Sequence, residues 1–128
     1  MLIFALCATT HSFSQVTFTP HTITTEANAA TSVYAVDVDS DGEMDVLSAS
    51  SSDDKIAWYE NDGSGEFQRH DLGISKGPHS IVAHDIDQDG DIDLLTASQR
   101  ENQVAWHRND GHNRFAPRRS EEHTSELQ

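Results

Sequence analysis

Short runs of alternating apolar and polar residues follow one another along the chain, a pattern typical of β-strands with one buried face. The first run begins at Val33, and three more follow it: Asp45–Ser50, Ile56–Glu60 and Glu66–Leu72. Asn, Asp and Gly at residues 61–65 predict a hairpin turn between the last two runs, because these residues tolerate positive φ. No stretch of ten residues shows helical periodicity. We therefore expect an all-β fold.

The pattern then repeats. Shifting the chain by 48 positions aligns residues 33–67 with residues 81–115 and gives 15 identities in 35 positions without a gap. A period of this length is typical of repeat proteins, in which one unit cannot bury its apolar face alone. Four short strands in about 45 to 50 residues are what one propeller blade requires. The sequence therefore predicts two four-stranded antiparallel blades of an incomplete β-propeller.

Composition narrows the possible functions. The 128 residues include 22 acidic and 8 basic side chains, which gives a net charge of −14. Such a chain repels phosphate backbones, so we expect no nucleic-acid binding. Hydrophobic residues make up only 35% of the chain, which predicts a thin apolar core and folding assisted by something else. The single cysteine, Cys7, excludes an intramolecular disulfide framework.

The acidic residues are concentrated in two loops. Ten of the 22 lie in two nine-residue windows, 37–45 and 85–93, and both windows read D-x-D-x-D-G-x-x-D. Carboxylates at positions one, three and five converge on one hard cation once the chain curls, and glycine at position six permits the sharp turn. Position seven can offer its backbone carbonyl, and position nine closes the shell. Oxygen donors in this number favour Ca²⁺ over Mg²⁺ and over transition metals.

An EF-hand begins with the same spacing, but it needs a glutamate at position twelve and a helix on each side. Here position twelve is Ser48 in one loop and Thr96 in the other, and strands are predicted on both sides. The EF-hand is therefore rejected. The remaining alternative is a solvated acidic hairpin without metal. The duplication of the whole nine-residue spacing argues against it.

The acidic motif lies between two predicted strands and is followed by N-D-G-x-x-x-F in both repeats. With these motifs the chain resembles the FG-GAP/VCBS repeat family over residues 32–118. The resemblance implies blades of an integrin-α-like β-propeller, with each acidic loop joining the first and second strands of its blade. It implies calcium ligation by the side chains of Asp37, Asp39, Asp41, Asp45, Asp85, Asp87, Asp89 and Asp93. Glu43 and Asp91 would contribute main-chain oxygens.

Other residues are assigned smaller roles. Trp58 and Trp106 lie in mid-strand and are expected to pack between neighbouring blades, the alternative being exposed platforms that stack sugars. We expect His70, His107 and His112 to be solvated, because they lie near strand ends or turns. Histidine and aspartate are plentiful enough to leave a Ser-His-Asp triad open, but no nucleophile elbow supports one.

The chain divides into five predicted segments. Residues 1–14 resemble a secretory signal peptide that lacks its basic start, with a buried strand at Leu2–Ala8 as the alternative. Residues 15–31 are predicted to be a strand remnant of a preceding or closing blade, with its strand at Val16–Thr24. Blade one is predicted at 32–78 and a truncated blade two at 79–118. Residues 119–128 resemble a translated sequencing adapter and are expected to be a non-native tail.

These expectations predict a secreted or cell-surface, non-enzymatic, calcium-binding module that binds or scaffolds a protein or a glycan. We expect no membrane insertion of the mature chain, because the apolar run at Leu2–Ala8 is too short to span a bilayer. The alternative is a propeller domain of a larger secreted enzyme, such as a polysaccharide lyase or hydrolase. In that case the catalytic residues would lie outside this chain.

Overall fold

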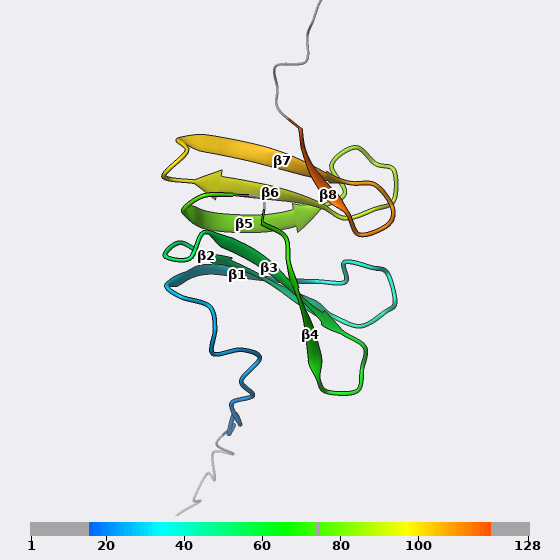
Figure 1. Cartoon of the computed structure of the whole chain (residues 1–128). Coiled ribbons are helices and arrows are strands. Elements are labelled where there is room, and N and C mark those ends of the chain that lie inside the picture. Colours follow the sequence, from blue (N-terminus) through cyan, green and yellow to red (C-terminus); the bar gives the residue numbers. More distant parts are fainter. Residues whose placement is uncertain (1–15, 74, 119–128) are drawn as a thin grey trace, which may run out of the picture.

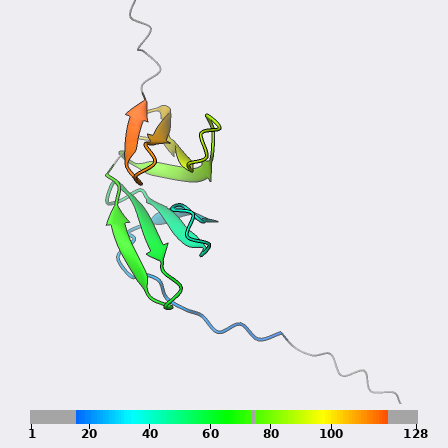
Figure 2. The ribbon, with the colours of Figure 1, turned by 90° about the vertical axis from the view of Figure 1, so that its right-hand side faces the viewer.

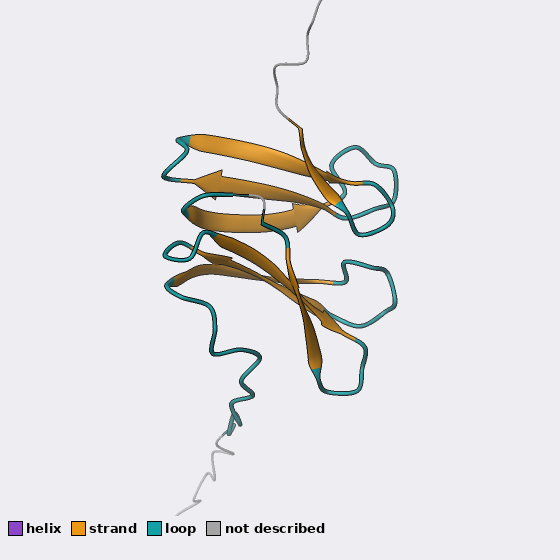
Figure 3. Cartoon of the chain, viewed as in Figure 1, coloured by secondary structure: helices purple, strands orange, loops and turns teal. Residues whose placement is uncertain are grey.

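The computed structural model describes residues 16–73 and 75–118, which form two antiparallel sheets (Figures 1 and 3). The first sheet contains four strands in chain order: β1 (Ala30–Val36), β2 (Asp45–Ser50), β3 (Lys55–Asn61) and β4 (Phe67–Asp71). The second sheet has the same order: β5 (Pro78–His84), β6 (Asp93–Ser98), β7 (Gln103–Asn109) and β8 (Phe115–Arg118). The predicted all-β fold with two four-stranded units is confirmed. The sheets are stacked without closing into a ring, which is consistent with propeller blades (Figure 2).

The sequence repeat is reproduced in the strand register. Val33 pairs with Ser48 in the first sheet, and Ile81 pairs with Thr96 at the equivalent place in the second. Both first strands also carry an irregularity at their beginning, between Ala30 and Ser32 and between Pro78 and Ser80. The two units therefore share their pairing residue by residue.

The apolar core lies between the two sheets. Leu47, Ile56 and Trp58 of the first sheet pack in one buried cluster with Ile81 and Leu94 of the second. The predicted packing between the units is confirmed for Trp58, which belongs to this cluster and is only 4% exposed. Trp106, for which the same packing was predicted, is half-buried and is not among the residues of this cluster. Hydrogen bonds also cross between the units. The Thr31 hydroxyl donates to the Pro78 carbonyl at 3.2 Å, the Ile81 amide donates to the Ser32 hydroxyl at 3.3 Å, and the Arg100 guanidinium donates to Asp54 at 2.9 Å.

Equivalent positions of the two units differ in burial. Ile56 is fully buried, whereas its equivalent Val104 is 76% exposed; conversely, Ile81 is 1% exposed and its equivalent Val33 is 70% exposed. The first sheet thus buries the face that carries Ile56, and the second sheet buries the face that carries Ile81. These two faces form the shared core. The two outer faces carry the counterparts of the core residues, an arrangement typical of units that stack on one another.

The segment before β1 differs from the prediction. No strand is formed within residues 16–29, although a strand was predicted at Val16–Thr24. A strand needs a neighbour to receive its backbone hydrogen bonds, and none of the described strands pairs with this segment. Residues 21–25 and Ala27 instead line a hollow of about 560 Å³ against the outer face of the first sheet, beside Val33. β1 begins at Ala30, two residues before the predicted start of the first unit.

The predicted signal peptide at 1–14 and the predicted adapter-derived tail at 119–128 lie outside the described residues. Within the described residues, no helix is long and apolar enough to cross a membrane.

His107 is buried rather than solvated, which corrects the expectation from its place near a strand end. Its ring is 1% exposed, and Nε2 lies 2.9 Å from the Thr96 hydroxyl on the neighbouring strand. Burial lowers the pKa of His107, against a smaller opposite effect from the charge of Glu101. At the equivalent place in the first unit, the Tyr59 hydroxyl lies 3.4 Å from the Ser48 hydroxyl. His70 is half-buried and stacks on Trp58, while His112 is exposed.

We expect Ile56→Ala to lower the free energy of unfolding by about 2 to 5 kcal/mol, because it opens a cavity in the shared core. The matched control is Val104→Ala at the equivalent exposed position, which should change stability by about 0.5 kcal/mol or less. Urea unfolding followed by tryptophan fluorescence measures both. Equal effects of the two substitutions would contradict the packing of the two sheets described here.

The depressed pKa of His107 predicts that acidification destabilises the fold. Above the unfolded-state value of about 6.5 the histidine is neutral in both states, and its contribution to stability is complete. As the pH falls through the folded-state pKa, this contribution is lost, because the unfolded chain binds the proton more readily. The variant His107→Tyr carries the residue found at the equivalent position of the first unit, Tyr59. Between pH 7 and pH 5 it should therefore lose less stability than the unsubstituted chain. Parallel pH profiles of the two proteins would refute this prediction.

Candidate metal centre

The two acidic loops occupy the same place in each sheet. Residues 37–44 join β1 to β2, and residues 85–92 join β5 to β6, as predicted. Their curl depends on two residues with positive φ in each loop. Position six is Gly42 (φ 97°) or Gly90 (φ 99°), and position four is Ser40 (φ 63°) or Gln88 (φ 62°). Glycine adopts this conformation without the steric cost that other residues incur, so position six has the residue that the turn requires.

The first aspartate of each loop closes the curl. Both oxygens of Asp37 accept backbone N–H groups, from Asp41 at 3.2 Å and from Gly42 at 3.0 Å. Asp85 makes the same pair of contacts, with Asp89 at 3.2 Å and Gly90 at 3.0 Å. The loop is thus folded by its own carboxylates before any ligand is considered.

The ninth aspartate ties each loop to its sheet. Asp45 is fully buried, and its Oδ2 accepts the Val38 N–H at 3.0 Å while its Oδ1 accepts the Asn61 N–H at 2.8 Å. Asp93, also fully buried, accepts the Ile86 N–H at 3.2 Å and the Asn109 N–H at 2.8 Å. One carboxylate therefore joins the acidic loop to the end of the third strand of its sheet.

The asparagine of the N-D-G turn completes this junction. The Asn61 side chain donates to the Met44 carbonyl at 3.1 Å and accepts the Gly63 N–H at 3.1 Å. Asn109 does the same with Ile92 at 3.2 Å and Gly111 at 3.1 Å. The N-D-G pattern predicted only a hairpin turn here, and this second role of the asparagine was missed. The available signal was the recurrence of N-D-G at the same offset as the acidic motif.

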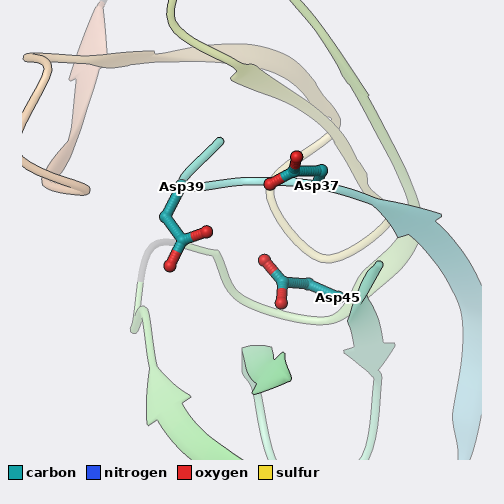
Figure 4. A group of neighbouring side chains, drawn as sticks. All are labelled: Asp37, Asp39 and Asp45. Carbon is teal, nitrogen blue, oxygen red and sulfur yellow. The ribbon is translucent and has the colours of Figure 1, made fainter. Parts of the chain in front are cut away.

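Three carboxylates converge in each loop. In the first, Asp37, Asp39 and Asp45 each place one oxygen within 4.8 Å of the others, and their carboxylates face a common centre (Figure 4). In the second loop the group contains Asp85, Asp87 and Asp89, so the fifth position of the motif takes the place that the ninth has in the first loop. The predicted ligands Asp41 and Asp93 stand outside these groups.

Position seven points its side chain away from the carboxylate groups. A Cβ added to Gly63 would lie 3.3 Å from Cδ of Glu43, and one added to Gly111 would lie 2.9 Å from Oδ2 of Asp91. These side chains therefore rest against the N-D-G turn. This placement agrees with the expectation that Glu43 and Asp91 act as ligands through their main-chain oxygens and not through their side chains. The main-chain role itself stays a prediction.

The electrostatics of the two loops differ. Burial raises the pKa of Asp39, and the negative charges of Asp41, Asp45 and Glu60 raise it further, against a hydrogen bond from the Asp41 amide that lowers it. In the second loop, the Asp91 amide and the Arg108 guanidinium lower the pKa of Asp89. A carboxylate whose charged form is disfavoured by its neighbours is stabilised by a nearby cation.

The chemistry of the donor groups fits a metal ion. Each group consists of carboxylate oxygens, which are hard ligands suited to hard divalent cations. The second loop already binds one cationic group, because the guanidinium of Arg108 donates to Asp87 at 2.6 Å and to Asp89 at 2.7 Å. Both acidic clusters could therefore hold a metal ion.

A family model described as FG-GAP-like repeat matches residues 37–96 and, a second time, residues 85–125. The chain belongs to the FG-GAP-like repeat family. Both matches begin at the first aspartate of an acidic loop, so each FG-GAP-like repeat of this chain starts at a candidate metal site. The resemblance drawn from the acidic motif and the N-D-G turn is confirmed. Comparison with curated proteins and with solved structures gave no match.

We expect Asp45→Asn to lower the free energy of unfolding of this FG-GAP-like repeat chain by about 1 to 3 kcal/mol in the presence of a chelator. The amide side chain has a single oxygen, so one of the two N–H groups bound by Asp45 loses its acceptor. Asp41→Asn, which removes the same charge at an exposed position of the same loop, is the control. Denaturant unfolding measures both variants. An effect of Asp45→Asn no larger than that of Asp41→Asn would contradict the anchoring role.

Proposed function

We propose that this chain is a secreted, calcium-stabilised repeat module that binds or scaffolds a protein or glycan partner and has no catalytic activity of its own. The observation that carries the proposal is the duplicated loop. Two separate sheets present carboxylates at the same place, on the same curled backbone, with the same buried anchor at position nine. A solvated acidic hairpin has no need for this agreement of geometry in two units.

Calcium is the ion that this donor set favours. Ca²⁺ takes six to eight oxygen ligands in flexible geometry, whereas Mg²⁺ demands a smaller and more regular shell and retains its water. The converging side chains supply carboxylates alone. The proposed ligands are the side chains of Asp37, Asp39, Asp41, Asp45, Asp85, Asp87, Asp89 and Asp93, with main-chain oxygens of Glu43 and Asp91.

The residues of the chain connect such a site to the fold. Asp45 belongs both to the carboxylate group and to the junction with Asn61, so the position of the loop and that of the third strand depend on one side chain. When bound, Ca²⁺ offsets the repulsion among the clustered carboxylates. The loop, the junction and the N-D-G turn then form one rigid end of each sheet.

Both acidic loops and both N-D-G turns lie at the same end of the stacked sheets (Figure 1). We place the partner of the module on this kind of loop surface, which successive units build side by side. The net charge of −14 disfavours a nucleic-acid partner. Secretion is supported by the signal-like residues 1–14 and by the millimolar calcium outside cells, which suits modules with dissociation constants of about 10⁻⁴ to 10⁻³ M.

The proposal predicts that calcium raises the thermal midpoint of the chain. Binding to the folded state alone stabilises by mass action, and a calcium concentration about ten times the dissociation constant should raise the midpoint by roughly 6 to 11 °C per occupied site relative to a chelator. Magnesium at the same concentration should raise it less. Differential scanning calorimetry measures these midpoints.

The double variant Asp39→Asn with Asp87→Asn should lose most of this calcium-dependent rise, because it removes one carboxylate from each group. Asp62→Asn with Asp110→Asn is the matched control: it removes the same charge from the N-D-G turns and should keep the rise. Identical midpoints of the unsubstituted chain with calcium and with chelator would refute structural calcium.

A further inference from the structure

Two equivalent positions beside the acidic loops carry opposite charges. Glu60 on β3 and Arg108 on β7 are separated by the repeat offset of 48 residues. Each precedes the asparagine that binds the buried aspartate of its unit, Asn61 or Asn109. The two acidic loops are thus alike in their own residues but face side chains of opposite sign.

Arg108 bridges the carboxylates of the second loop. Its Nε donates to Asp87 at 2.6 Å and its Nη2 donates to Asp89 at 2.7 Å, so one guanidinium holds the third and fifth positions of the motif together. Both aspartates belong to the group that could hold a metal ion. The arginine side chain is 41% exposed, so it has room to swing into solvent.

The first loop has no such partner. Among the described residues, no lysine or arginine forms an ion pair with the carboxylates of Asp37, Asp39, Asp41 or Asp45. Glu60 instead adds a negative charge, which raises the pKa of Asp39 as the charges of Asp41 and Asp45 do. The carboxylate of Glu60 is held by His70, whose Nε2 lies 2.6 Å from it.

We propose that Arg108 acts as a built-in cation of the second loop and makes its affinity for calcium lower than that of the first loop. This inference rests on the proposed function. A metal ion at the second loop must displace the guanidinium and break two ion pairs, whereas at the first loop it meets an additional negative charge. Because two ion pairs of the second loop must break, we expect this loop to bind calcium about tenfold more weakly than the first.

The arrangement also gives the two loops different roles when calcium is scarce. When calcium is scarce, the Arg108 guanidinium offsets the carboxylate charge of the second loop. The first unit is therefore the calcium-sensitive part of the molecule. Both loops keep the curl that their first aspartate closes, but only the second loop has its repulsion offset without the ion.

Calcium titration of the ¹⁵N-labelled full chain, followed by NMR, resolves the two loops. The amides of Gly42 and Gly90 serve as probes, because each donates to the first aspartate of its own loop. We expect the Gly42 resonance to shift with a midpoint at about tenfold lower calcium than that of Gly90. Arg108→Gln should bring the Gly90 midpoint close to that of Gly42 and leave the Gly42 midpoint unchanged.

Two further variants serve as controls. Arg100→Gln removes the same charge from an exposed arginine that pairs with Asp54 in the turns at the opposite end of the strands, and it should leave the ratio of midpoints unchanged. Glu60→Gln should weaken binding at Gly42 by about twofold without changing Gly90, because it removes a partly exposed charge next to the first loop only.

The outcomes separate this inference from the proposed function. If neither glycine resonance responds to millimolar calcium, the proposed calcium site is wrong and the inference falls with it. If both resonances shift at the same calcium concentration in the unsubstituted chain, calcium binding stands and the inequality of the loops is refuted. If Arg108→Gln and Arg100→Gln change the Gly90 midpoint equally, the effect belongs to net charge and not to the bridging guanidinium.

Discussion

A buried carboxylate with two backbone donors is the interaction on which each unit depends. Asp45 and Asp93 stand at the first residue of the second strand, where one oxygen holds the acidic loop and the other holds the end of the third strand. Burying a charged group costs free energy of folding unless its hydrogen bonds are satisfied. Here both oxygens are satisfied by N–H groups that the sheet itself leaves unpaired at its edge. One carboxylate and one asparagine thus link the loop, the strand end and the N-D-G turn in each unit.

This junction explains why an acidic loop belongs in a protein with a thin apolar core. The buried cluster is shared by two sheets, and neither sheet buries its apolar face alone. Under the proposed function, a cation bound between the carboxylates adds stability at the loop end and adds no apolar surface. The cost is repulsion among the carboxylates, which one unit reduces with an arginine and the other increases with a glutamate.

Several features were predictable because they depend on local chemistry. The strand at Asp45–Ser50 was predicted with its observed bounds, since alternation and the flanking turn residues mark both ends. The loop backbone was predictable from glycine at position six, and the family from the acidic motif with N-D-G. The strand expected at Val16–Thr24 was wrong, because a favourable local pattern forms no strand without a pairing edge. His107 was misjudged for a related reason, because its burial depends on Thr96 and the packed sheet around it.

By itself, the sequence determined the number of units, their strands, the turn geometry and the presence of two candidate metal loops, all of which follow from residues close together in the chain. The tertiary structure alone decided which face of each sheet is buried. Ile56 and Val104 have the same local pattern, yet only one of them meets the other sheet. It also decided that Arg108 reaches the second loop, because a contact across 21 residues depends on how the strands pair. Periodicity reports which side chains share a face, and only packing determines what that face meets.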